Sequence, residues 1–301
     1  MDQLAAMRAF VRVVETGSFT RAADLIAMPK ATLTKHIQQL EAHLATRLLN
    51  RTTRRVTVTP DGAAYYERAL AILNDLEELD GSLSASQASP RGRLRIDLPS
   101  SLAIEVMIPA LPDFLARYPD IQVDMGSTDR PVDLLGENVD CVIRVGAIRD
   151  ASLVARRIGQ MPFLTCAAPS YIAVHGLPRH PRDLDVDHHI VRYFSEATGR
   201  YYDHAFRQGG EVIEVAGRYR IACNDGMAYL AAGLAGLGIL QVPAFMAARH
   251  VAEGALVPVL AGWDSEPLPI HVVYAPNRHL SNRVRVFVDW AADRFARAQL
   301  A

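Results

Sequence analysis

The residues best suited to contact a partner lie near the N-terminus, between Lys30 and Gln38. Here Leu33, Ile37 and Leu40 recur at steps of four and three, the spacing of one buried helix face. The side chains on and beside the opposite face are Lys30, Thr32, Thr34, Lys35, His36 and Gln38. A short, polar and cationic helix face of this kind fits the major groove of a DNA duplex. A solvated surface helix has the same pattern, so the flanking sequence must separate the two interpretations.

Two consecutive helices are predicted in this region. Ser18 is a suitable N-cap for the first, whose apolar side carries Ala22 and Ala23. Pro29 interrupts the pattern. Because proline is tolerated in a first helical turn, we place the start of the second helix there.

A basic segment follows the second helix and leads into the alternating β pattern Val56-Thr57-Val58. Its cationic and hydroxyl residues are Arg51, Thr53, Arg54 and Arg55. A basic turn in a short hairpin is typical of the wing of a winged helix, which places arginines on phosphates or in the minor groove. The two helices and the wing together favour DNA binding.

These residues carry a family resemblance. Residues Met1 to about Leu83 resemble the N-terminal part of LysR-type transcriptional regulators. The matching positions are Ala22, Ala23, Leu33, Thr34, Lys35, Ile37, Leu40, Glu41, Leu48, Leu49, Arg51, Arg54, Arg55, Thr59 and Gly62. The family usually has serine at the position of Pro29, so the capping of the second helix is left open. It often has serine at Thr34, which keeps the hydroxyl.

The charge distribution agrees with a DNA-binding N-terminus. The 301 residues carry a formal net charge of −1. Residues 1–58, however, contain nine Lys or Arg against four Asp or Glu, which leaves the remainder near −6. Phosphates would attract the first segment and repel the rest.

A long helix is predicted from Pro60 to about Leu83. Its apolar positions recur as in a heptad and are Tyr65, Ala69, Ile72, Leu76, Leu79 and Leu83. This stripe either packs on its own domain or pairs with the same helix of a second chain. We expect pairing, since no further N-terminal element remains to cover it, and a two-fold dimer would read a pseudo-palindromic operator. Residues 81–93 are small, polar and broken by glycine and proline, which is typical of a linker.

From Leu94 onward strands alternate with helices, which indicates βαβ units in an α/β fold. The predicted elements include strands at 94–98, 121–125 and 141–145 and a short helix at 132–135. This region resembles the family's effector-binding part, similar to periplasmic binding proteins with two α/β subdomains. The expected domains are a mainly α winged helix-turn-helix at 1–58, a linker helix and hinge at 59–92, and an effector-binding domain at 93–301. Within the last, subdomain I covers about 93–161 and 267–301, and subdomain II about 162–266.

Ligands in open α/β sheets bind at the carboxyl ends of strands. The candidate effector-binding residues at these ends are Ser100, Ser101, Thr128, Arg144, Ala168, Phe194 and Asn224. The resemblance implies a small effector between the subdomains. Ser100 and Ser101 at a helix start, together with Arg144, favour an organic acid. Arg144 has an equally good structural role, as the partner of Asp133 or Asp140.

No catalytic or metal-binding motif stands out. Gly233 to Gly238 has the wrong order for a dinucleotide fingerprint, and His180, His188 and His189 lack ligand spacing. The three cysteines are interpreted as buried, reduced thiols. We expect a cytoplasmic, non-enzymatic regulator without a cofactor or a membrane segment. It would bind double-stranded DNA and a small effector, form a homodimer through the linker helix and, as the family usually does, a homotetramer. The alternatives are a soluble small-molecule binding protein whose N-terminal helices serve only oligomerisation and, third, an enzyme.

Overall fold

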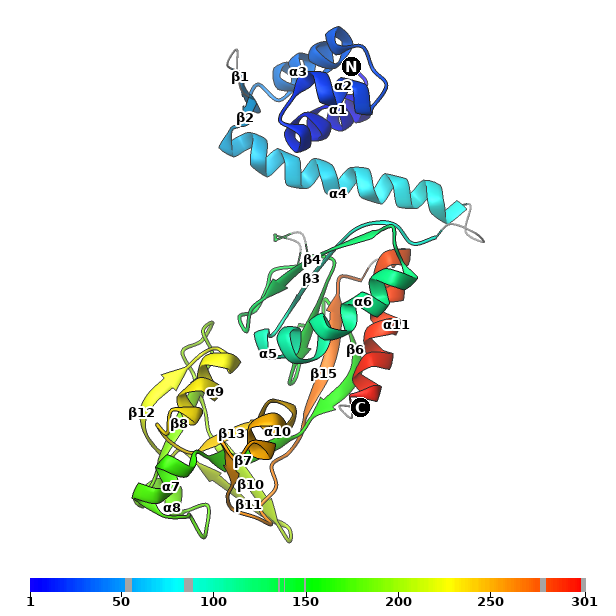
Figure 1. Ribbon diagram of the computed structural model, residues 1–301. Coiled ribbons are helices and arrows are strands. Elements are labelled where there is room, and N and C mark those ends of the chain that lie inside the picture. Colours follow the sequence, from blue (N-terminus) through cyan, green and yellow to red (C-terminus); the bar gives the residue numbers. More distant parts are fainter. Residues whose placement is uncertain are drawn as a thin grey trace. The chain divides into compact units, whose positions relative to one another are not determined.

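The structure is a computed structural model that describes residues 1–51, 56–83, 89–134, 136–137, 139–148, 150–276 and 280–298 (Figure 1). Within these ranges, the side chains at 51, 71, 74–75 and 77–83 lie outside the description. The chain divides into two units, Met1–Ser89 and Pro90–Ala301, each described by itself. No helix among the described residues is long and apolar enough to cross a bilayer.

The N-terminal unit packs three short helices, a hairpin and the start of a long helix. Its elements are α1 (Gln3–Thr16), α2 (Phe19–Leu25), α3 (Lys30–His43), β1 (Leu49–Arg51), β2 (Val56–Val58) and α4 (Pro60–Leu83). Leu33, Ile37 and Leu40 are each 0% exposed, which confirms the predicted buried face of α3. Ser18 caps α2 through the Arg21 amide, also as predicted.

Two details of the N-terminal unit explain positions in the predicted family pattern. Glu41 Oε1 accepts the Leu48 and Leu49 amides at 2.9 and 3.1 Å, which ties α3 to the hairpin. A side chain at Gly62 would meet the Leu48 carbonyl oxygen at 2.0 Å, so only glycine fits where α4 passes β1. Thr59 Oγ1 accepts the Gly62 amide at 2.9 Å and caps α4.

Helix α4 spans the predicted residues. The first half of its apolar stripe, however, packs within its own unit and not, as expected, on a second chain. Ala69 and Leu73 are 1% and 6% exposed and pack on Met7 and Val11 of α1. Helix α1 therefore covers this part of the stripe. Ile72 is 47% exposed and remains available for a partner.

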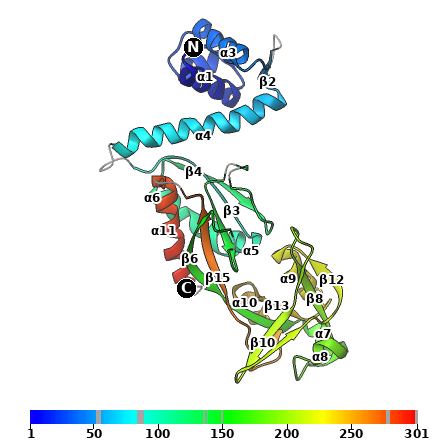
Figure 2. The same cartoon turned by 180° about the vertical axis from the view of Figure 1, so that it is seen from behind.

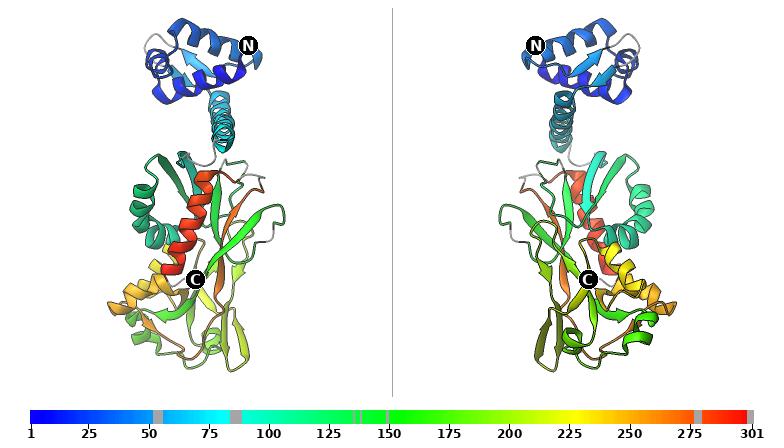
Figure 3. Two further views of the ribbon diagram at one scale, coloured as in Figure 1. Left: turned by 90° about the vertical axis from the view of Figure 1, so that its right-hand side faces the viewer. Right: turned by 90° about the vertical axis from the view of Figure 1, so that its left-hand side faces the viewer.

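The C-terminal unit contains a mixed five-stranded sheet of order β4-β3-β5-β15-β6. Its strands are β3 (Gly92–Leu98), β4 (Ile121–Ser127), β5 (Cys141–Val145), β6 (Val154–Met161) and β15 (Leu268–Tyr274). Strand β3 runs parallel to β4 and β5, whereas β15 runs antiparallel to β5 and β6. Helices α6 (Ile108–Arg117) and α11 (Asn282–Arg297) share one hydrophobic core with this sheet. Figure 3 shows both helices beside its strands. We call this sheet and its helices the first lobe.

The helix after β3 is not uniform. It runs through α5 (Ser100–Leu102), a π-helical turn η1 (Ala103–Met107) and α6. Pro109 and Pro112 in α6 lack the amide hydrogens that would bond the carbonyls one turn earlier, and a wider turn just before them accommodates this.

The second lobe comprises the elements from β7 to β14 (Figure 2). Its strands are β7 (Phe163–Ala167), β8 (His189–Phe194), β9 (Tyr201–Tyr202), β10 (His204–Gln208), β11 (Glu211–Val215), β12 (Arg218–Cys223), β13 (Leu240–Pro243) and β14 (Val257–Pro258). Its helices are α7 (Pro169–His175), α8 (Asp183–Val186), α9 (Gly226–Leu234) and α10 (Ala244–Ala252). Strand β12 pairs with β8 in parallel, and β7 pairs with β13 and β14 antiparallel.

Two of the detailed predictions need correction. The helix expected at 132–135 is absent from its described residues 132–134. Instead, Asp133 Oδ1 accepts the Gly136 amide at 2.9 Å, closing a turn of the kind that aspartate favours over helix. In α3, Pro29 stands at the N-cap, one residue before the helix, with no side-chain cap bond.

Candidate nucleic-acid interface and effector site

The α3 face opposite the core is open to a partner. Lys30, Thr32, Lys35 and Gln38 are exposed, and Thr34 and His36 are half-buried. The Thr34 hydroxyl donates to the Lys30 carbonyl at 2.8 Å, so it is held against the helix with its oxygen still able to accept. All six predicted contact residues are thus on α3, most with accessible side chains.

The start of α3 adds backbone donors to this face. Pro29 supplies no side-chain oxygen, so the N-cap residue makes no side-chain hydrogen bond to the first amides of α3. Unpaired amides at a helix N-terminus carry partial positive charge and suit a phosphate oxygen. The N-terminal amides of α3, which Pro29 does not cap, are therefore suited to contact a DNA phosphate.

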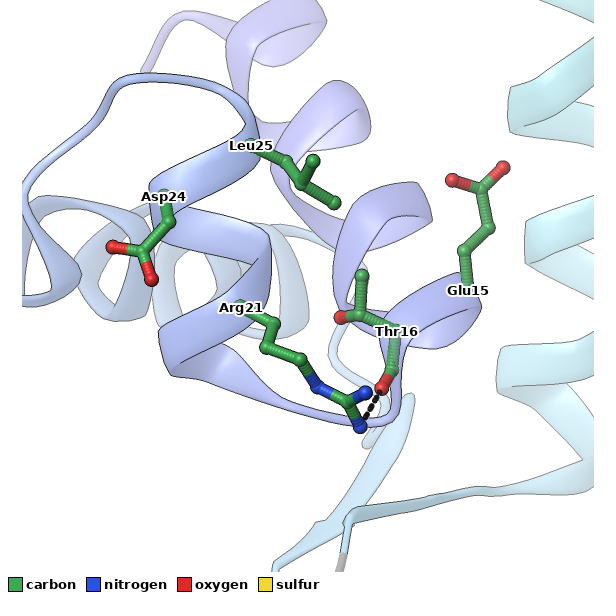
Figure 4. A pocket seen from close by; sticks show the side chains of 5 residues that line it. All are labelled: Glu15, Thr16, Arg21, Asp24 and Leu25. Atoms are coloured by element: carbon green, nitrogen blue, oxygen red, sulfur yellow. Dashed lines mark hydrogen bonds between the residues drawn. The ribbon is translucent and has the colours of Figure 1, made fainter.

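A shallow hollow nearby is less suited to phosphate. It lies between the end of α1 and α2 and includes Glu15, Arg21 and Asp24 (Figure 4). Arg21 donates to the Thr16 carbonyl at 2.9 Å, and the two carboxylates would repel an anion. The hollow is accordingly not part of the predicted interface.

The wing is only partly described. Strands β1 and β2 form the predicted antiparallel hairpin, with Leu49 opposite Val58. Thr53, Arg54 and Arg55 lie outside the described residues, as does the side chain of Arg51. Their roles stay predictions.

Some of the candidate effector residues lie where the first lobe faces the second. The Ser100 hydroxyl, at the start of α5, donates to Asp225 at 2.6 Å. Asp225 is the N-cap of α9 and accepts the Ala228 amide at 2.8 Å. Ser101 is 6% exposed beneath this contact. We call this meeting of α5 and α9 the junction.

Asp129 makes a second bridge across the junction. It follows β4 and Thr128, and its Oδ2 accepts the Tyr193 hydroxyl and the Gly226 amide, both at 2.8 Å. Burial raises the pKa of Asp129 more than these hydrogen bonds lower it. The Tyr193 hydroxyl also lies 3.0 Å from the Asn224 carbonyl oxygen, to which it can donate.

Arg144 serves a structural role in the first lobe. Its guanidinium donates to Asp97 at 2.6 Å and to the Ile143 carbonyl at 2.9 Å. The Asp97 residue is 6% exposed, and a side chain at Gly126 would meet its Oδ2 at 2.4 Å. The observed ion pair is thus with Asp97 and not with Asp133 or Asp140.

Two further predicted site residues do not reach the junction contacts. Ala168 is 2% exposed in the second-lobe core. Phe194 packs against Tyr201, with ring centroids 5.9 Å apart. Tyr193, one residue earlier on β8, reaches Asp129 instead. Successive residues of a strand point to opposite faces, so only one of these two neighbours can reach Asp129, and tertiary packing decides which one.

Both units match known families. The family model described as "Bacterial regulatory helix-turn-helix protein, lysR family" matches residues 4–63. The one described as "LysR substrate binding domain" matches residues 87–296. The chain belongs to the LysR-type transcriptional regulator family. It is therefore a DNA-binding regulator with an effector-binding domain.

Relatives cover nearly the whole chain. An uncharacterised HTH-type transcriptional regulator of Escherichia coli, YhjC, is 42% identical over 97% of this chain and 97% of its own. An HTH-type transcriptional repressor of Pseudomonas aeruginosa is 40% identical over 98% and 93%.

Solved structures agree. The full-length Vibrio cholerae virulence activator AphB is 31% identical, with a TM-score of 0.58 over 96% of this chain and 98% of its own. CrgA from Neisseria meningitidis is 30% identical, with a TM-score of 0.60 over 96% and 97%.

Proposed function

We propose that this regulator reads an operator with α3 and the wing, and that a small organic acid at the junction alters its activity. Gln38 and Thr34 would contact base edges, with Lys30, Lys35 and the first amides of α3 on phosphates. Thr32 and His36 would border the same contact. Arg51, Thr53, Arg54 and Arg55 would hold the backbone or the minor groove. The single observation that carries this assignment is the exposed, uncapped N-terminal face of α3.

The proposed effector class rests on Ser100. Its hydroxyl donates to the carboxylate of Asp225, and an organic acid could accept the same hydrogen bond. An effector carboxylate would replace Asp225 there and loosen one bond between the lobes. Arg144 is committed to Asp97, so we assign it a supporting role. An effector changes activity only if it binds one arrangement of the two lobes more tightly than another. An effector that replaces Asp225 would favour the arrangement in which this bond is broken.

We further propose a homotetramer, which needs two distinct interfaces. The exposed Ile72 on α4 suits the first, between linker helices of a dimer. Ile104, Ile108 and Leu115 are 47%, 50% and 39% exposed along η1 and α6, and suit the second. Such a regulator would work in the cytoplasm, on the bacterial chromosome.

A gel shift with the DNA upstream of the protein's own gene tests the proposal. Binding that survives an excess of unrelated DNA supports it. The absence of a specific complex would favour a small-molecule binding protein. A thermal-shift screen in which only cationic or apolar compounds stabilise the protein would contradict an organic-acid effector.

A further inference from the structure

A second pocket lies on the second lobe, apart from the junction. Its volume is about 360 Å³. Tyr171 and His175 of α7, His189 at the start of β8, Arg220 and Ile221 of β12, and Leu237 after α9 line it. Figure 2 shows α7 beside the strands β8 and β12. A space of this size accepts a single ring with a small substituent.

Hydrogen bonds hold the floor of this pocket in place. Tyr171 is 3% exposed, and its hydroxyl accepts the His189 amide at 2.8 Å. The same hydroxyl lies 3.3 Å from Nδ1 of buried His188. The Tyr171 ring stacks on His175 at 4.5 Å, which forms an aromatic wall. Ile221 and Leu237 add apolar surface, so the pocket can hold a flat, apolar body.

A strand irregularity aims two neighbouring side chains at the pocket. Tyr219 pairs with Ile190 and Ala222 with Arg192, so β12 has one extra residue between these pairs. In a regular strand Arg220 and Ile221 would point to opposite faces. Here both line the pocket. Bulges of this kind re-aim side chains and are common beside functional sites.

The ionisable side chains that line the pocket, apart from the Tyr171 phenol, are all basic. Burial, then the cations Arg220, Arg218 and His175, hold the pKa of His189 below its usual value. The carboxylates Asp183 and Asp187 act on His188, behind the floor. Among the residues that the structure describes, none forms a hydrogen bond or ion pair with the Arg220 side chain. An exposed guanidinium beside two imidazoles attracts an anion, and a carboxylate matches it bidentately.

We propose that this pocket binds a small organic anion, with its carboxylate on Arg220 and His189 and its apolar body on the Tyr171–His175 wall. The site is separate from the junction, but the same two strands reach both. Strand β8 runs from His189 to Tyr193, and β12 leads from Arg220 to the Asp225 cap of α9. An anion here can therefore act as a second input to the effector domain.

The test uses benzoate as the probe and the full-length protein, by titration calorimetry at about pH 6 and about pH 8. We expect Arg220→Gln to weaken benzoate binding by about tenfold or more, the loss of one charge-assisted contact. Affinity should be higher near pH 6, because a bound anion favours protonated His189. Neutral benzamide should bind at least about tenfold more weakly than benzoate.

Two controls separate this site from the junction. Arg179→Gln removes an exposed arginine elsewhere on the second lobe and should leave benzoate affinity unchanged. Ser100→Ala tests the junction, and should also leave this binding event intact. The proposal would be overturned if Ser100→Ala lost benzoate binding while Arg220→Gln kept the wild-type affinity. Equal affinity for benzamide and benzoate, or no benzoate binding at all, would also overturn it. Unchanged thermal unfolding of Arg220→Gln would establish that the variant is folded.

Discussion

The Ser100 hydroxyl and the Asp225 carboxylate lie 2.6 Å apart, joining two helix starts that are 125 residues apart in sequence. The carboxylate of Asp129 bridges the same junction to the Gly226 amide. The chain's own acids thus occupy donors that would suit an anionic ligand. The effector domain can respond to such a ligand because binding would replace an internal bond.

The first prediction concerns this internal bond. Ser100→Ala removes a hydrogen bond to a charged group, a type of bond that contributes about 1.5–3 kcal/mol. The first turn of α9 should then open more often, and its amides should exchange with deuterium at least about tenfold faster. Hydrogen exchange with mass spectrometry would measure this.

Ser152→Ala is a matched control for this experiment. The Ser152 hydroxyl also donates to an aspartate at 2.6 Å, but within a local turn at Asp150. The Ser152→Ala variant should leave deuterium exchange in α9 unchanged. Equal exchange of α9 in the wild type and in Ser100→Ala would show that the bond does not hold the junction.

The second prediction concerns pH. His204 is 5% exposed, and burial lowers its pKa to about 4. Its unfolded pKa is near 6.5, so between these values the unfolded chain binds the extra proton. The stabilising contribution of neutral His204 is present above about pH 6.5 and is lost as pH falls towards 4, by about 3 kcal/mol.

Urea unfolding at several pH values would measure this loss. His204→Gln cannot titrate, so the difference in unfolding free energy between wild type and variant should change across the window. A difference that is constant from about pH 7 to about pH 4 would contradict a buried neutral histidine.

The third prediction concerns assembly. Ile72→Glu places a charge on the exposed side of α4 and should weaken the dimer by at least about tenfold, since two such charges would meet in a two-fold interface. Analytical ultracentrifugation would measure the dissociation constant. Val212→Glu changes another exposed residue, on β11, and serves as the control. An unchanged dimer in the α4 variant would exclude pairing through Ile72.

The fourth prediction separates affinity from specificity. Replacing Arg54 and Arg55 by glutamine should weaken binding to every DNA and flatten the salt slope by up to about two. Changing Thr34→Val or Gln38→Ala should instead alter which operator sequence is preferred. Binding curves on a set of operator variants at several salt concentrations would measure both. Equal losses on every sequence from both sets would contradict these roles.

The sequence predicted what depends on neighbouring residues. The buried face of α3, the span of α4 and the cap at Ser18 follow from local periodicity and local hydrogen bonds. Contacts between distant segments were not predictable in this way. The partner of Arg144 is Asp97, 47 residues earlier, and it meets Arg144 only once β3 and β5 pair.

Contacts between distant segments also decide which side of α4 is buried and which residue of β8 reaches the junction. The buried side of α4 depends on how α1 packs against it, which heptad spacing does not contain. The selection of Tyr193 over Phe194 depends on which face of β8 meets the junction. Both choices are made by tertiary packing.

The central claim is that the exposed face of α3 is shaped for a DNA duplex. Its most direct test is the ratio of dissociation constants for the gene's own upstream DNA and a scrambled duplex of equal composition, measured at one salt concentration. The account predicts a ratio of about 10³ or more in favour of the upstream DNA. Equal affinity for the two duplexes would contradict it.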